Sequence, residues 1–364
     1  MSSFDWRSLL GATLLVSCSN QEPAAQGGSG AQGGSTSTVP SMTSAGGGDS
    51  SASSSSAGNT SSGGTSSSGG NAGVGGTEQG GGSSVPDPGS LSADSRLYTT
   101  DGSEFLIDEA GEAFVHAMAA GPDNLILYVH GRGCGGGGEP QKSLSGAMPE
   151  LESDYSAAAI MFNWPGSDVG CPLGFPEDEA RAAGQALAHT LHVLAYFKSQ
   201  NAGLFSGLRL TLITHSMGSL VLEQALTDDP LPLPSSLFHT AMIGSAASAR
   251  SGHASWLTKA TLSEALYVSV NAGDNVLTAA AALGGARLGK SVAGEPLATN
   301  ALYVDFTASD ANHAYYLHSG QNGAHMTGFY DQVMNGLPFD FSATSGVSEV
   351  EERDGTFIYH FDGN

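Results

Sequence analysis

The sequence predicts an α/β fold, with a mostly parallel central sheet that carries helices on both faces. Three observations support this. Apolar runs of strand length alternate with segments of helical periodicity from about residue 96 to the end. The run at 124–130 is apolar almost throughout, as expected of a central strand buried on both faces. The run at 208–213 leads through Ser216 directly into a helix.

The first 18 residues have the pattern of a bacterial lipoprotein signal. Their apolar run, 9–16, is too short to span a bilayer, and small residues precede Cys18. This pattern predicts that Cys18 is lipidated and anchors the exported protein at the cell envelope. An ordinary secretion signal is the alternative, because Arg7 is the only cation of the segment and Asp5 partly offsets it.

Residues 19–95 consist largely of Gly, Ser, Ala and Thr, with hardly any large apolar side chain. Such a composition cannot bury a core, so we predict a disordered tether followed by one folded domain at 96–364. The net charge of −23 argues against nucleic acid as a partner and against an anionic membrane surface. The membrane contact expected is therefore the lipid anchor alone.

The folded domain is expected to open with an antiparallel pair, 97–107 and 113–118, joined by a turn at 108–111. Helices are expected at 144–151, at 176–198 and after Ser216. The remaining predicted strands follow in order: 124–130, 157–163, 208–213, 237–243, 266–270 and 301–306. A closing hairpin is predicted at 350–359, with an Asp-Gly turn.

The stretch Thr214-His215-Ser216-Met217-Gly218 follows the G-x-S-x-G pattern of a nucleophile elbow, with threonine in the first place. Such an elbow holds its serine in a strained backbone conformation between a strand and a helix. Small residues on either side make room for the turn. The pattern predicts that Ser216 is a catalytic nucleophile.

A glycine-rich loop, 131–138, follows the strand that ends at His130. In hydrolases with this elbow, such a loop contributes one backbone N–H to the oxyanion hole, and the residue after the nucleophile contributes the other. The predicted donors are the N–H groups of Arg132 and Met217. A glycine-rich surface loop without a function is the alternative.

A nucleophilic serine needs a base and a carboxylate, which follow it along the chain in the order acid, then histidine. Asp274 comes directly after the strand 266–270 and is the predicted acid, although it could instead cap the next helix. Three histidines follow the last strand, His313, His318 and His325, and spacing does not choose among them.

Several motifs occur together in order: Phe162-Asn163-Trp164-Pro165-Gly166, the elbow, Asn271-Ala272-Gly273-Asp274-Asn275-Val276-Leu277, Arg287-Leu288-Gly289 and His313-Ala314-Tyr315-Tyr316. This set resembles an uncharacterised bacterial α/β-hydrolase family described as esterase- or lipase-like. The resemblance covers roughly residues 124–335. It implies Ser216 as nucleophile, Asp274 as acid and His313 as base, with His325 as the runner-up.

Cys134 and Cys171 follow strands that are neighbours in the fold that this family adopts, so we expect a disulfide between them in an exported protein. No histidine and cysteine spacing suggests a metal site, and no cofactor is expected. The favoured hypothesis is a lipid-anchored serine hydrolase acting on a small-molecule or lipid ester. A catalytically silent hydrolase-fold lipoprotein that serves as a binding or structural module is the alternative.

Overall fold

The computed structural model describes residues 94–119, 121–132, 138–166, 175–229, 231–341 and 346–363, with main chain only at 138–141. The predicted signal at 1–18 and nearly all of the predicted tether at 19–95 lie outside these residues, so their boundaries stay predictions. No helix of the described segments has the length and apolar character needed to cross a bilayer.

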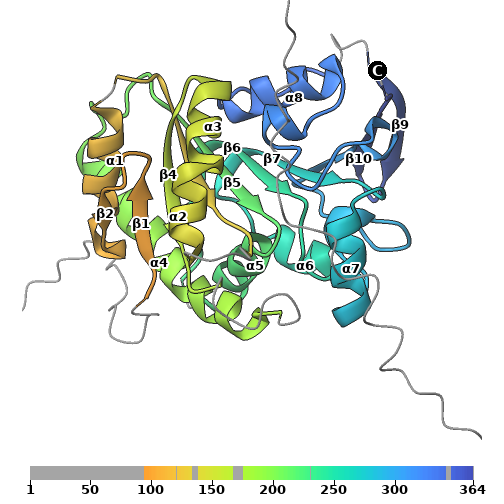
Figure 1. Cartoon of the computed structure of the whole chain (residues 1–364), viewed down its shortest axis with the longest axis horizontal. Coiled ribbons are helices and arrows are strands. Elements are labelled where there is room, and N and C mark those ends of the chain that lie inside the picture. Colours follow the sequence, from red (N-terminus) through yellow and green to blue (C-terminus); the bar gives the residue numbers. More distant parts are fainter. Residues whose placement is uncertain are drawn as a thin grey trace, which may run out of the picture. The chain divides into compact units, whose positions relative to one another are not determined.

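The described residues form a single ten-stranded sheet in the order β2-β1-β4-β3-β5-β6-β7-β8-β10-β9. The strands are β1 Arg96–Thr99, β2 Glu104–Phe105, β3 Asn124–Val129, β4 Ala158–Asn163, β5 Arg209–His215, β6 Phe238–Gly244, β7 Ser263–Val270, β8 Leu302–Asp305, β9 Val347–Arg353 and β10 Thr356–Phe361. The strands from β4 to β10 in this order run parallel to one another, and β1, β2 and β9 pair antiparallel at the two edges. Figure 1 shows this sheet at the centre of the domain.

Helices cover both faces of the sheet, as predicted. They are α1 Ala110–Met118, α2 Gly138–Ser145, α3 Ala147–Tyr155, α4 Glu177–Gln200, α5 Gly218–Asp228, α6 His253–Leu257, α7 Asn275–Gly284 and α8 Ala324–Met334. Side chains of β3 alternate between the two faces. Leu125 and Leu127 pack in one core with α1, α4 and α5, whereas Ile126 and Tyr128 pack in a second core with α3 and α8.

The prediction of an opening strand pair is wrong for its second strand, because residues 113–118 belong to helix α1. The buried positions of α1 recur at helical spacing, at Ala110, Ala113, Phe114 and Ala117. Gly111 had suggested a turn, but a side chain there would clash with the ring of Phe197 on α4. The glycine therefore allows two helices to pack closely.

The closing hairpin is confirmed, and it extends the sheet. Its two strands, β9 and β10, meet at Asp354 and Gly355, both with positive φ (55° and 80°), as a two-residue hairpin turn requires. Strand β10 pairs parallel with β8, so the hairpin lies beside the last strand of the parallel sheet. The strand order, with the predicted elbow at the end of β5, is that of an α/β-hydrolase fold.

Candidate active site

Ser216 lies between β5, which ends at His215, and α5, which begins at Gly218. Its φ is 51°, in the left-handed region that costs a non-glycine residue about 1–3 kcal/mol. Two neighbours hold it there: its N–H donates to the carbonyl of Gly244 (3.0 Å), and its carbonyl accepts from the N–H of Ala247 (3.0 Å). The serine is thus fixed in the strained conformation that the elbow pattern predicted.

Two glycines allow the backbone to approach closely around this serine. A Cβ on Gly218 would clash with the carbonyl oxygen of Val129, so α5 can begin against β3 only with glycine there. A Cβ on Gly131 would lie 2.8 Å from the Cβ of Ser216. The glycine at the start of the loop after β3 therefore brings that loop beside the serine.

Asp274 and His313 form a close pair. Nδ1 of His313 lies 2.7 Å from Oδ2 of Asp274, whose side chain is fully buried, while 17% of the His313 side chain is exposed. The other carboxylate oxygen, Oδ1, accepts the N–H of Leu277 (2.9 Å) and caps α7. One oxygen of Asp274 therefore caps the helix, as the alternative interpretation predicted, and the other contacts His313.

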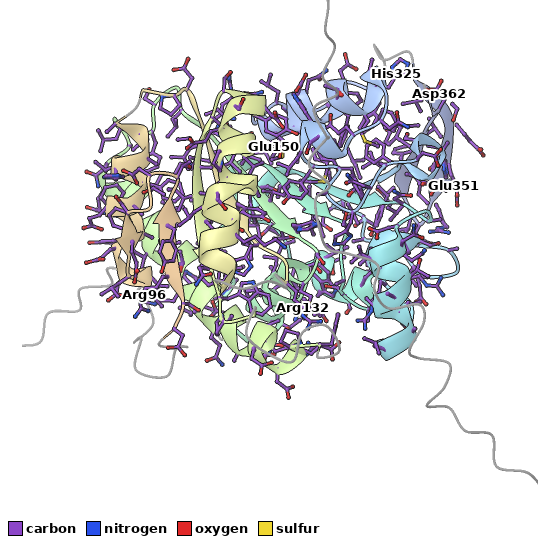
Figure 2. The ribbon with its side chains drawn as sticks, viewed as in Figure 1. Arg96, Arg132, Glu150, His325, Glu351 and Asp362 are labelled. Atoms are coloured by element: carbon purple, nitrogen blue, oxygen red, sulfur yellow. The ribbon has the colours of Figure 1, made fainter. Side chains whose placement is uncertain are left out.

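The other two candidate histidines have partners elsewhere. Nε2 of His318 lies 2.9 Å from Asp331, and its main-chain N–H donates to Asp154 (2.8 Å). Nε2 of His325 lies 3.9 Å from Oδ1 of Asp362. Figure 2 shows His325 near Asp362 at one end of the domain, well apart from Arg132. Of the three histidines, the structure brings only His313 to Asp274.

His313 also lies close to the elbow. Its ring centroid is 4.8 Å from that of His215, the residue before Ser216. Among the described residues, no hydrogen bond joins Oγ of Ser216 to His313; such contacts are often long until substrate binds. Ser216, Asp274 and His313 follow β5, β7 and β8, and the carboxyl ends of parallel strands meet at one edge of a sheet.

The predicted oxyanion donors lie at the same edge. The N–H of Met217, at the start of α5, has no hydrogen-bond acceptor among the described residues. It is thus available to a negatively charged oxygen, and a helix N-terminus favours such a charge. Arg132 follows Gly131 and is the last residue of its described segment. Both N–H groups belong to turns that adjoin Ser216.

His130 fixes the start of the glycine-rich loop after β3. The main-chain N–H of Trp164 donates to Nε2 of His130 (3.1 Å), which places the ring proton on Nδ1, where it donates to the carbonyl of Gly131. The indole N–H of Trp164 donates to the carbonyl of His130 (2.9 Å), and the two rings stack. The fully buried Trp164 thus braces this loop.

The remaining sequence predictions for the site are not tested. Cys18, Cys134 and Cys171 lie outside the described residues, so the lipidation and the disulfide stay predictions. Within the described segments, no group of three or more histidine, cysteine, aspartate or glutamate side chains could hold a metal ion.

No family model and no curated protein matches the chain. Solved structures match distantly. An esterase/lipase from an uncultured bacterium is 16% identical, over 58% of this chain and 75% of that chain, with a TM-score of 0.27. An esterase of Pyrobaculum calidifontis is 12% identical, over 58% of this chain and 76% of that chain, with a TM-score of 0.30. ESTFA is 12% identical, over 70% of this chain and 86% of that chain, with a TM-score of 0.34. The fold assignment rests on the strand order described above.

Proposed function

We propose that this chain is a serine hydrolase that cleaves esters by acyl transfer. One observation carries the proposal: a serine held at φ 51° after β5 shares a sheet edge with a buried aspartate 2.7 Å from a histidine. A left-handed serine costs free energy and persists only where its surroundings enforce it, and such strain gathers at functional sites. A histidine with a carboxylate on Nδ1 presents Nε2 as a base.

In the proposed reaction, Oγ of Ser216 attacks the ester carbonyl while Nε2 of His313 takes the hydroxyl proton. Asp274 holds the Nδ1 proton and stabilises the imidazolium that forms. The N–H groups of Met217 and Arg132 stabilise the oxyanion; losing one such donor typically costs about 10²- to 10³-fold in rate. His313 then protonates the departing alcohol, leaving an acyl group on Ser216.

Water completes the cycle. It attacks the acyl carbonyl and gives its proton to His313, and the collapse of the second oxyanion returns the proton to Oγ and releases the acid. The burial of Asp274 supports this scheme, because charge stabilisation is stronger where water is excluded. Groups of this chain perform every step, and the proposed reaction uses no cofactor.

The substrate we propose is a small-molecule or lipid ester at the cell envelope, where a lipid on Cys18 would anchor the protein. The net charge of −23 opposes binding to nucleic acid. The proposed disulfide between Cys134 and Cys171 would brace the loop after β3. A thiol count under denaturing, non-reducing conditions tests it: two free cysteines would reject the disulfide.

The proposal is tested with the full-length protein and short p-nitrophenyl esters. We expect the wild type to hydrolyse p-nitrophenyl butyrate and Ser216→Ala to lose nearly all of that activity. Ser255→Ala is a matched control, since this exposed serine on α6 bonds only locally, to the carbonyl of Gly252. A folded wild-type protein that hydrolyses no ester would overturn the proposal and favour the silent binding module.

A further inference from the structure

A second serine repeats the elbow geometry beside Ser216. Ser245 follows β6 as Ser216 follows β5, and its φ is 48°, against 51° for Ser216. The two turns are adjacent, because β5 and β6 pair in parallel with His215 opposite Gly244. The N–H of Ser216 also donates to the carbonyl of Gly244 (3.0 Å). The two left-handed serines thus stand next to each other at the edge of the sheet.

Ser245 and His215 both reach the main-chain carbonyl of His313. Oγ of Ser245 donates to this oxygen at 2.7 Å, and Nε2 of His215 lies 3.3 Å from it. Since a carbonyl only accepts, each of these groups acts as a donor. Burial, and next the charge of His313, lower the pKa of His215 well below its usual value, so the ring is neutral near pH 7 with its one proton on Nε2.

The main chain at His313 has little regular structure to hold it. The residue lies between the short 3₁₀ turns at 307–309 and 318–320, outside any helix or strand. Two tyrosines secure the chain just beyond it. The hydroxyl of Tyr315 lies 3.0 Å from Oγ of Ser269, and the hydroxyl of Tyr316 lies 2.9 Å from that of Tyr128. These bonds hold residues two and three positions away, whereas Ser245 and His215 hold His313 itself.

We propose that Ser245 is a positioning residue of the active site. By holding the carbonyl of His313, its hydroxyl keeps the imidazole between Asp274 and Ser216. The inference rests on the proposed hydrolase function. Glycine would adopt φ 48° without strain, so the feature that serine adds here is the hydroxyl donor. The hydroxyl of Ser245 bonds to the main-chain carbonyl of the base, so its proposed effect is exerted through the main chain.

Ser245→Gly tests this role in the full-length protein, because it removes the hydroxyl and also relieves the backbone strain. Ser248→Ala is the matched control. Ser248 is a buried serine of the same segment, and its hydroxyl bonds to Ser219 (2.8 Å). We expect kcat for p-nitrophenyl butyrate to fall about 10- to 100-fold in Ser245→Gly, as for a base displaced by about 1 Å. KM should stay within about threefold, since binding is not the step affected.

Stability separates positioning from general damage. Ser245→Gly should unfold at a urea concentration close to that of the wild type, because the backbone strain that glycine relieves offsets the lost hydrogen bond. A kcat within twofold of wild type would overturn the inference. An equal loss of kcat in Ser248→Ala would also overturn it, because that loss would reflect packing of the whole segment.

An NMR signal tests the inference even if the wild type proves inactive. The Nδ1 proton of His313, held by Asp274, should give a low-field resonance that His313→Ala removes. We expect this resonance in the wild type and in Ser248→Ala, and a broadened or absent one in Ser245→Gly. An unchanged resonance in Ser245→Gly would refute positioning by Ser245, whereas absent hydrolysis with an altered resonance would refute only the hydrolase function.

Discussion

Replacing Asp274 by asparagine separates the two contacts of this carboxylate. Asparagine and aspartate cap helices about equally well, so Asp274→Asn keeps the bond to the N–H of Leu277. The amide nitrogen would instead face Nδ1 of His313 and donate to it. The imidazole proton would then move to Nε2, which could no longer accept the proton of Ser216. The exchange should disable the base and leave the helix intact.

The magnitudes follow from these contacts. A wrong histidine tautomer lowers kcat about 10⁴-fold while the geometry stays intact, and we expect that loss for Asp274→Asn. Its free energy of unfolding should change by no more than about 1 kcal/mol, because the cap remains. Asp274→Ala removes the cap as well, so it should lose about 1 kcal/mol more than Asp274→Asn.

Two assays on the full-length variants test this reasoning: initial rates of p-nitrophenyl butyrate hydrolysis and urea unfolding. Asp274→Ser is a useful third variant, because serine caps well but offers no charge to His313. The reasoning would be refuted if Asp274→Asn kept more than a tenth of the wild-type rate. It would also be refuted if Asp274→Asn and Asp274→Ala lost equal stability, since the cap would then contribute nothing.

Three further predictions follow from the described contacts. His313→Ala should abolish ester hydrolysis, while His318→Ala and His325→Ala should keep the rate within about threefold of the wild type. A larger loss in His325→Ala would favour His325 as the base. Gly218→Ala should lower the free energy of unfolding by about 1–3 kcal/mol, because its Cβ overlaps a carbonyl of β3, and an unchanged urea midpoint would contradict this overlap. Burial lowers the pKa of His253 below 6.5, so the unfolded chain takes up the proton first as pH falls, and native stability declines below that pH. The wild type should therefore lose more stability between pH 6.5 and 5 than His253→Gln does, by at most about 1.4 kcal/mol per pH unit, whereas parallel stability curves would contradict the lowered pKa.

The sequence was sufficient to predict the parts of the fold that local pattern determines. These parts depend on residues that are close in sequence: the buried run of β3, the strand-to-helix break at Ser216 and the Asp-Gly turn of the last hairpin. Helix α1 was misread because Phe114 and Val115 favour strands and Gly111 suggested a turn. The ring of Phe197 explains that glycine, and sequence pattern does not place a residue of α4 against it.

The site was predictable as a set of candidates rather than as a geometry. Spacing left three histidines open, and the choice of His313 needs the contact with Asp274 across 39 residues of chain. The roles of His215 and Ser245 depend on contacts across 98 and 68 residues. No local sequence motif predicts these two roles. A buried serine after a strand is common, and its contacts depend on the register of β5 and β6.

The nucleophilic role of Ser216 is tested most directly by a fluorophosphonate probe on the full-length wild type, followed by mass spectrometry of the modified peptide. We predict one adduct, on Ser216, that is lost in Ser216→Ala and in His313→Ala and kept in Ser248→Ala. Ser216→Gly is the stringent negative control, since glycine adopts the same backbone without strain. A folded wild-type protein without an adduct, or one labelled on another serine, would contradict the assignment of Ser216 as an activated nucleophile.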